Sequence, residues 1–260
     1  MFMRLVQMRV DPEKIPEFKE VYERTIIPTL QQIPGCAYAG LIQSLEEASD
    51  GMSITLWDRL EDALAYEQSG KYAEMLEVAR PFFSASSEWK VQLSAGLQPE
   101  FLPVVPEPVV RSYTMNLPAP KAPGLPGGHA GSTYLRIVSM KLKSDKKAEF
   151  VEIYHREIIP TLRQVEGCLD AYLAEGVRGE NEVLCVTIWS GLEHARAYEE
   201  TGKFDALKEK VEHTFSNLAR WKMALDDVPI TGSQGIAKRA VTSDDVNVRT
   251  YSILLGKTLG

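Results

Sequence analysis

The sequence predicts an α+β protein that contains two tandem copies of a β-α-β-β-α-β unit. Residues 3–93 and 135–225 align without a gap at a constant offset of 132, and about 35 of the 91 aligned pairs are identical. Agreement at that level identifies an internal duplication. In both copies, apolar residues alternate where a strand is expected and recur every three or four residues where a helix is expected. The same architecture is therefore predicted for both halves.

The first copy begins with a strand followed by a long helix. Residues 4–10 alternate between apolar and polar side chains, which is typical of a half-buried strand. Asp11 and Pro12 then supply a capping side chain and a first-turn proline. Apolar side chains follow at helical spacing along one face. Pro34-Gly35 ends this helix.

The remainder of the copy predicts a hairpin, a broken helix and a closing strand. Residues 36–45 and the segment that ends at Trp57 flank a polar turn, which is typical of a hairpin. Residues 60–83 have helical spacing that is interrupted at Gly70. Residues 89–93 alternate again and predict the last strand. This order of elements is that of a ferredoxin-like fold.

An additional strand is expected after each copy. The sequence Val-Val-Arg-Ser-Tyr-Thr near residues 108–115 resembles Asn-Val-Arg-Thr-Tyr-Ser near residues 246–255. We therefore divide the chain into a first repeat over 1–117, a Pro/Gly-rich linker over 118–132 and a second repeat over 133–260.

A four-stranded sheet with helices on one face leaves its other face bare, and a bare apolar face must be covered. We expect the two repeats to pack face to face as a pseudo-two-fold α+β barrel, which is a pseudo-dimer within one chain. The additional strands are expected to reach across and seal it. The sequence leaves open whether a further homodimer forms.

Composition restricts the possible partners. The net charge of −7 over 260 residues argues against nucleic acid or an anionic membrane as a partner. No segment approaches the length of a membrane span. The three cysteines, Cys36, Cys168 and Cys185, have no metal-ligand spacing, and we expect buried thiols in a reducing, cytoplasmic setting. A small molecule is the expected ligand, and no metal site is predicted.

One face of the opening strand is a candidate pocket wall. Arg4, Val6 and Met8 share that face and are identical to their counterparts Arg136, Val138 and Met140, whereas the opposite face differs at every position. One interpretation is that the matched face packs more tightly. The other is that it lines a pocket between the sheet and the helices.

Aromatic and hydroxyl side chains extend this candidate site. Thr55 and Trp57 share one face of the third strand, and Tyr22 and Tyr66 have polar tips that can reach the same cavity. The same residue types recur in the second repeat, as Tyr154, Thr187, Trp189 and Tyr198. Buried aromatic residues are more often core, but such a pocket suits a flat phenolic substrate.

Each half resembles the antibiotic biosynthesis monooxygenase-like (ABM) domain of the dimeric α+β barrel superfamily. The resemblance rests on the opening strand, the proline-containing helix before Gly-Cys, the hairpin that ends in Trp, and a closing Ser/Thr-Gly-Lys-aromatic motif. That motif is Ser69-Gly70-Lys71-Tyr72 in the first repeat and Thr201-Gly202-Lys203-Phe204 in the second. The resemblance implies the barrel fold. Its members include cofactor-free oxygenases of quinols and aromatic polyketides, haem-degrading enzymes and proteins without known activity.

The chain departs from two signatures of the family. Many members carry a histidine where this chain has Tyr66 and Tyr198. The Asn-Trp-His set of the haem-degrading members is also replaced, and its three positions fall on Met8, Tyr66 and Leu76, and on Met140, Tyr198 and Lys208. Haem degradation by that route is not expected.

The resemblance and the duplicated aromatic set together predict a cofactor-independent monooxygenase-like protein that acts on a small aromatic or quinol-type substrate. Such chemistry requires a base and an apolar, water-poor site. The catalytic candidates are Tyr66, Tyr198 and His155, and the predicted substrate-binding residues are Met8, Tyr22, Thr55, Trp57, Met140, Tyr154, Thr187 and Trp189. The alternative is a non-catalytic ligand-binding or oligomerising barrel.

Overall fold

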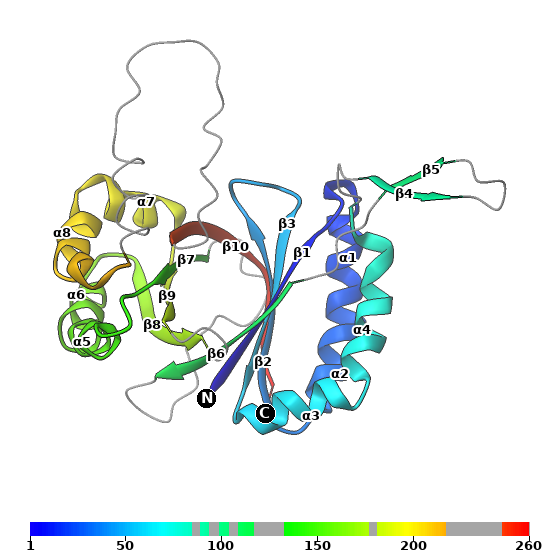
Figure 1. Cartoon of the computed structure of the whole chain (residues 1–260), viewed down its shortest axis with the longest axis horizontal. Coiled ribbons are helices and arrows are strands. Elements are labelled where there is room, and N and C mark those ends of the chain that lie inside the picture. The colour runs from blue at the N-terminus through cyan, green and yellow to red at the C-terminus, as the bar shows by residue number, and fades with distance from the viewer. Residues whose placement is uncertain are drawn as a thin grey trace, which may run out of the picture. The chain divides into compact units, whose positions relative to one another are not determined.

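The computed structural model describes residues 1–84, 89–93, 99–103, 109–116, 133–176, 181–216 and 246–259. Contacts divide the chain into two units, each built around one of the repeats, and each unit is described by itself. Figure 1 shows their elements. The predicted linker over 118–132 lies outside the described residues, and the face-to-face packing of the repeats stays a prediction.

The first unit has an antiparallel sheet with its helices on one face (Figure 1). Strand β3 (Asp50–Trp57) lies between β1 (Phe2–Arg9) and β2 (Cys36–Ser44), and these three strands and the β2–β3 hairpin agree with the prediction. The helical segments are η1 (Pro12–Lys14), α1 (Ile15–Val21), η2 (Tyr22–Ile26), α2 (Ile27–Gln31), α3 (Leu60–Gln68), α4 (Lys71–Ala79) and η3 (Arg80–Phe82). Asp11 caps the first of them, because its Oδ1 accepts a hydrogen bond from the N–H of Glu13 at 3.1 Å.

The expected long helix contains a π-helical turn, η2, immediately before Pro28. Proline has no N–H to donate within a helix, so the hydrogen-bonding pattern must change around it. The N–H of Ile27 donates to the carbonyl of Tyr22, five residues earlier. The hydroxyl of Thr29 donates to the carbonyl of Thr25 at 2.8 Å. The proline therefore yields a π turn, which the sequence pattern did not predict.

The second unit repeats the first. Its sheet contains β7 (Tyr134–Lys141), β9 (Glu182–Trp189) and β8 (Cys168–Gly176) in the same antiparallel order. Its helical segments are α5 (Lys147–Ile153), η4 (Tyr154–Ile158), α6 (Ile159–Leu162), α7 (Leu192–Glu200), α8 (Lys203–Glu209) and η5 (Glu212–Thr214). The π turn recurs as η4, with the N–H of Ile159 donating to Tyr154. The prediction of two like α+β repeats is confirmed.

The two additional strands are present, and each completes the sheet of the opposite repeat. Strand β10 (Val246–Thr258) follows the second repeat, yet its residues 251–258 pair antiparallel with β2 of the first. Strand β6 (Val109–Asn116) follows the first repeat, and its residues 113–116 pair antiparallel with β8 of the second. Both units therefore receive an edge strand from a distant part of the sequence.

The predicted closing strand of the first repeat is a strand, but its expected place in the main sheet is wrong. Strand β4 (Trp89–Leu93) pairs with β5 (Pro99–Pro103) in a separate two-stranded sheet. The edge of the main sheet at β2 is occupied by β10. The chain that returns from α4 meets the end of β1 at a single bridge between Val10 and Phe83. The counterpart of β4 in the second repeat lies outside the described residues.

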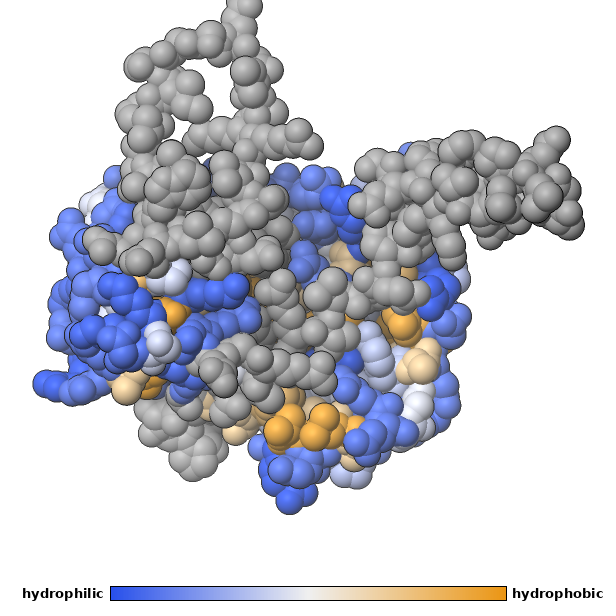
Figure 2. Space-filling view, viewed as in Figure 1, coloured by the Kyte–Doolittle hydropathy of each residue, from blue (hydrophilic) through white to orange (hydrophobic). Residues whose placement is uncertain are grey.

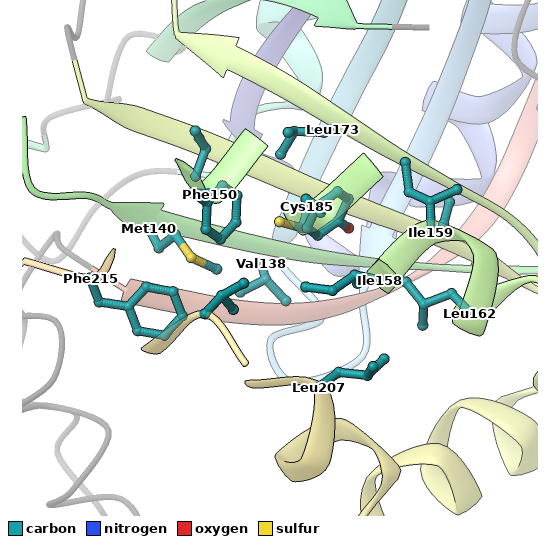
Figure 3. Packing of buried hydrophobic residues seen from close by; sticks show 14 of the residues in the cluster. Val138, Met140, Phe150, Ile158, Ile159, Leu162, Leu173, Cys185, Leu207 and Phe215 are labelled. Atoms are coloured by element: carbon teal, nitrogen blue, oxygen red, sulfur yellow. The ribbon is translucent and has the colours of Figure 1, made fainter. Parts of the chain in front are cut away.

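Each unit has its own hydrophobic core between the sheet and the helices. Figure 3 shows that of the second unit, where Phe150, Ile158 and Leu162 from the helices face Val138 and Cys185 from the sheet. The described surface in Figure 2 is mainly hydrophilic. Among the described residues, the exposed large apolar side chains are Leu45, Leu64 and Leu169. No helix within the described ranges has the length and apolar character to cross a bilayer.

Among the described residues, two glycines of each repeat adopt the left-handed conformation, and they offer a matched test of local packing. Gly167 (φ 77°) and Gly202 (φ 74°) have similar backbones, but a Cβ on Gly167 would overlap Cβ and Cγ of His194, whereas a Cβ on Gly202 would meet nothing within 4 Å. Gly202→Ala is expected to cost about 1–2 kcal/mol, the left-handed penalty alone. Gly167→Ala is expected to cost clearly more in urea unfolding. Equal costs for the two variants would contradict the overlap.

Candidate functional site

In each unit a cavity lies between the sheet and the helices. The cavity of the first unit measures about 460 Å³ and that of the second about 520 Å³, including space open to solvent. Fifteen residues line each cavity, and every one in the first has its counterpart in the second at the repeat offset. The first cavity is lined by Arg4, Val6, Met8, Phe18, Tyr22, Ile26, Leu30, Ser53, Thr55, Tyr66, Tyr72, Met75, Leu76, Ala79 and Phe83.

The matched face of the opening strand forms one wall of this cavity. Arg4, Val6 and Met8 all line it, as do Arg136, Val138 and Met140 in the second unit. The same side chains are also buried, so this face both packs in the core and lines the cavity. The strand alternation explains the arrangement, because every second residue of a strand faces the same side.

A buried arginine is the main charge in each cavity wall. The side chain of Arg4 is 2% exposed, and its Nε donates to Glu67 Oε1 at 2.8 Å. Its guanidinium carbon lies 4.1 Å from the ring centroid of Tyr72, a cation–π distance. Arg4 Nη2 is buried and has no hydrogen-bond partner within the described residues. A buried donor of this kind is unusual and offers a hydrogen bond to an acceptor on a ligand.

The second unit repeats this arrangement with one ring changed. Arg136 Nε donates to Glu199 Oε1 at 2.5 Å, and its side chain is 4% exposed. Its guanidinium carbon lies 4.3 Å from the ring centroid of Phe204. Both arginines therefore lie between a carboxylate and an aromatic ring at the wall of an apolar cavity. Sequence analysis placed them on the pocket face but did not include them among the site residues.

The predicted tryptophans support the cavity wall without lining it. Trp57 is fully buried, and its indole N–H donates to Thr55 Oγ1 at 2.9 Å. Its ring stacks on Tyr66 with centroids 5.2 Å apart. Trp189 makes the same contacts with Thr187, at 2.8 Å, and with Tyr198. Each tryptophan thus orients two lining residues from behind, whereas Met8, Tyr22, Thr55 and their copies line the cavities as expected.

The π turn places a tyrosine hydroxyl against the sheet. Tyr22 starts η2, and its hydroxyl donates to the carbonyl of Gly40 at 3.1 Å and lies 2.8 Å from Ser53 Oγ. In the second unit the counterpart, Tyr154, is hydrogen-bonded to Cys185. Such π turns occur frequently at functional sites. They re-aim one side chain of a helix without ending the helix.

Burial shifts the titration of the cavity hydroxyls away from a base role. Desolvation raises the pKa of Tyr66 and of Tyr198, and the neighbouring arginine only partly opposes this effect. Burial also raises the pKa of Tyr22 and Tyr154. A phenol with a raised pKa stays protonated at neutral pH. These directions favour hydrogen-bond donation by Tyr66 and Tyr198 over proton abstraction.

The third catalytic candidate, His155, does not line the cavity. It follows Tyr154 in η4 and is half-buried. The cysteines are free, and burial raises the pKa of Cys36 and of Cys185 to about 12, so both thiols stay protonated at neutral pH. Within the described ranges, no three His, Cys, Asp or Glu side chains gather as metal ligands do. Operation without metal or cofactor stays a prediction.

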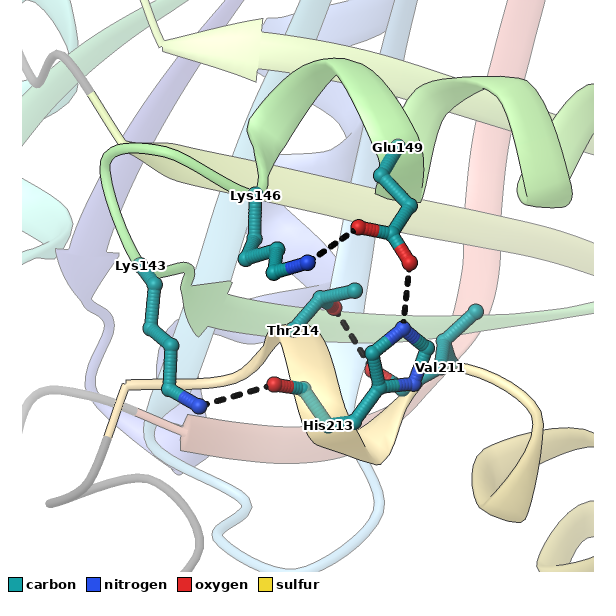
Figure 4. Close-up of polar contacts among 6 residues, drawn as sticks. All are labelled: Lys143, Lys146, Glu149, Val211, His213 and Thr214. Atoms are coloured by element: carbon teal, nitrogen blue, oxygen red, sulfur yellow. Dashed lines mark hydrogen bonds and ion pairs between the residues drawn. The ribbon is translucent and has the colours of Figure 1, made fainter.

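A cluster of polar side chains fixes η5, the turn that precedes the cavity-lining residue Phe215 (Figure 4). His213 Nε2 lies 2.7 Å from Glu149 Oε1, and Lys146 Nζ lies 2.7 Å from Glu149 Oε2. The hydrogen bonds from Lys146 and His213 lower the pKa of Glu149. Lys143 Nζ donates to the carbonyl of His213 at 2.9 Å, which fixes the turn before Phe215. These groups are exposed, so the cluster has a positional role.

The helix after Gly70 supplies a wall of the cavity that was not predicted from the sequence. Residues 72, 75, 76 and 79 of the first unit line the cavity, as do their counterparts 204, 207, 208 and 211. Their three- and four-residue spacing is the signal that one helix face points at the cavity. Five of the fifteen lining positions differ between the repeats: Ser53/Cys185, Tyr72/Phe204, Met75/Leu207, Leu76/Lys208 and Ala79/Val211. Four of these five lie on this helix.

Comparison with known proteins agrees with the duplicated architecture. The family model described as antibiotic biosynthesis monooxygenase matches residues 1–78 and 133–210, together more than half of the chain. No curated protein matches the sequence.

Similar solved structures share the fold at low identity. A candidate monooxygenase from Fusobacterium nucleatum has a TM-score of 0.63 and 9% identity, and the match covers 100% of this chain and 94% of that one. A candidate monooxygenase from Lactobacillus acidophilus has a TM-score of 0.61 and 9% identity, with 100% and 96% covered. An anthrone oxidase-like protein has a TM-score of 0.59 and 12% identity, with 100% and 93% covered.

Proposed function

The chain belongs to the antibiotic biosynthesis monooxygenase family, and from that premise we propose that it oxidises a small aromatic or quinol-type substrate with O₂ and without a cofactor. The single observation that carries the proposal is the pair of matched cavities, each with one buried arginine in an otherwise largely apolar wall. An apolar, water-poor cavity suits a flat ring, and the arginine suits the oxygen on that ring.

The arginine supplies the electrostatic part of the mechanism. A phenol or an anthrone becomes reactive toward O₂ when it loses a proton, and the negative charge then rests partly on its oxygen. The guanidinium of Arg4 or Arg136 stabilises that charge, because charge interactions are strong in a low-dielectric cavity. The partnerless Nη2 of Arg4 provides a donor for the substrate oxygen.

The hydroxyl groups and the apolar wall complete the arrangement. Tyr22 and Tyr66 are protonated phenols at neutral pH, and Tyr66 stacks on Trp57, so its ring is held in place. In the oxidation of an anthrone, the methylene carbon loses two hydrogens and gains one oxygen atom as a carbonyl, and the second oxygen atom leaves as water. Atoms and electrons therefore balance in this reaction without an external reductant.

A second candidate function is ligand binding without turnover. The observation that favours it is the raised pKa of the cavity tyrosines, which leaves neither Tyr66 nor Tyr198 suited to remove a proton. In that case rings of any acidity bind without reacting, whereas under the first candidate the oxidation rate rises with the acidity of the substrate. The two candidates therefore differ in their dependence on the acidity of the ligand.

The test is aerobic incubation of the full chain with a panel of hydroquinones and anthrones of graded acidity. We expect oxygen uptake above the buffer rate, fastest for the most acidic members, because they ionise most readily beside the arginine. Oxygen electrode traces give the rate, and the heat-denatured protein is the control. Uptake at the buffer rate for every member, together with measurable binding, would support the second candidate and overturn the first.

A further inference from the structure

The two cavities differ in charge at one position. Among the fifteen described residues that line the first cavity, Arg4 is the only charged one. The second cavity is lined by Arg136 and, in place of Leu76, by Lys208. The duplicated helix face therefore contributes a leucine side chain to one cavity and a lysine side chain to the other.

The lysine belongs to the interior rather than to the solvated surface. The side chain of Lys208 is only 13% exposed, although a lysine normally extends into water. Its Nζ lies 2.9 Å from Asp205 Oδ1, and that carboxylate is 57% exposed. The carboxylate partner thus faces solvent, while the largely buried side chain of Lys208 lines the cavity. Asp205 does not line the cavity, and the aligned residue of the first repeat is Ala73.

Both cations of the second cavity lie beside one ring. The Arg136 guanidinium carbon is 4.3 Å from the centroid of Phe204, and Lys208 Nζ is 5.9 Å from the same centroid. The distance between the two charges is therefore at most the sum of these two lengths. Glu199, which pairs with Arg136, is 45% exposed and does not line the cavity. Two cations on an apolar wall, with their carboxylates turned to solvent, form a site for an anion that carries a ring.

We propose that the cavity of the second repeat binds a hydroxy-aromatic carboxylate, with Lys208 holding the carboxylate and Arg136 the ring oxygen, whereas the first cavity takes an uncharged ring. This inference rests on the proposed function in one respect, namely that both cavities take aromatic ligands. It adds that the repeats have different ligands, chosen by position 208 and its counterpart at 76. The carboxylate distinguishes the two cavities, because in the first cavity Arg4 is the single described cation and pairs with the ring oxygen, so a carboxylate would be buried without a cation of its own.

The test measures binding under argon, so that turnover plays no part. The probes are 1-hydroxy-2-naphthoate and 1-naphthol, which differ in the carboxylate, and isothermal titration gives affinity and stoichiometry for the full chain. In Lys208→Leu the affinity for hydroxynaphthoate is expected to fall at least about tenfold, equivalent to about 1.4 kcal/mol. The affinity for naphthol is expected to change less than about twofold, which shows that the cavity is intact.

Two further variants sharpen the result. Leu76→Lys is expected to create a second site for hydroxynaphthoate, because the first cavity already contains Arg4 with its partnerless donor. Asp205→Asn removes the carboxylate that competes for Lys208, so the affinity for hydroxynaphthoate is expected to rise.

The outcomes separate this inference from the proposed function. Unchanged hydroxynaphthoate affinity in Lys208→Leu, with normal naphthol binding, overturns the inference and leaves the proposed function standing. Selective binding without oxygen uptake for any quinol supports the inference and overturns the proposed function. Failure of the natural chain to bind either probe overturns both, because neither cavity would then take an aromatic ligand.

Discussion

The double variant Arg4→Met/Arg136→Met is expected to oxidise the best substrate of the panel at least about 100-fold more slowly than the natural chain. A methionine has similar length and fills the apolar wall, but it cannot stabilise negative charge on the substrate oxygen. Each single variant is expected to keep the activity of the untouched cavity. The kcat/KM values of the two single variants therefore also identify which repeat turns the substrate over.

The control for this prediction is Arg24→Met. The side chain of Arg24 is 76% exposed and pairs with Glu20 on the helix surface, so its loss should leave the rate unchanged. Thermal unfolding of the double variant shows whether the fold persists, which we expect because Glu67 and Glu199 are partly solvated once their partners are gone. A folded double variant that oxidises the substrate at the rate of the natural chain would contradict a role of the two arginines in the mechanism.

Phe150→Ala is expected to destabilise the second unit by about 3–5 kcal/mol. Phe150 is fully buried, with its ring centroid 5.6 Å from that of Tyr154 and 6.3 Å from that of Phe215. It also borders the existing cavity, so its removal enlarges a space that the sheet and helices cannot close. Urea unfolding followed by intrinsic fluorescence and circular dichroism measures the loss.

The surface residue Leu169 provides the comparison. Leu169 is 55% exposed on β8, and Leu169→Ala is expected to change the free energy of unfolding by no more than about 0.5 kcal/mol. A loss below about 1 kcal/mol for Phe150→Ala would mean that the neighbouring side chains collapse into the space. In that case the walls of the cavity are deformable, and its volume in the unliganded protein would not restrict the size of a ligand.

Most of the fold was predictable because its signals are local. Alternation over 4–10 and helical spacing from Ile15 to Ile33 each report which face of an element is buried, and the duplication repeats the signal. The place of β4 was not predictable in this way. A short alternating strand can join any free edge, so its pattern does not specify its partner, which here is β5.

The site was predictable to the extent that it lies on strands. Met8 and Thr55 were assigned to the cavity from period two alone, and both line it. Trp57 was misplaced because a strand pattern gives the face of a residue but not its depth, and the indole lies behind Tyr66. The difference between Leu76 and Lys208 was not predictable as a feature of the site, because the sequence pattern does not show that this helix face lines the cavity.

The exchanged strands β6 and β10 restrict how the two repeats can evolve. Neither repeat is a complete folding unit by itself, since each has an edge strand that is encoded with the other. A mutation that separated the halves would leave both sheets with an unpaired edge, a hazard for aggregation. Both halves must therefore be present for both sheets to keep these strands. A substitution such as that at position 208 nevertheless alters one cavity and leaves the other unchanged. In a symmetric dimer of two identical chains, the same substitution would appear in both cavities.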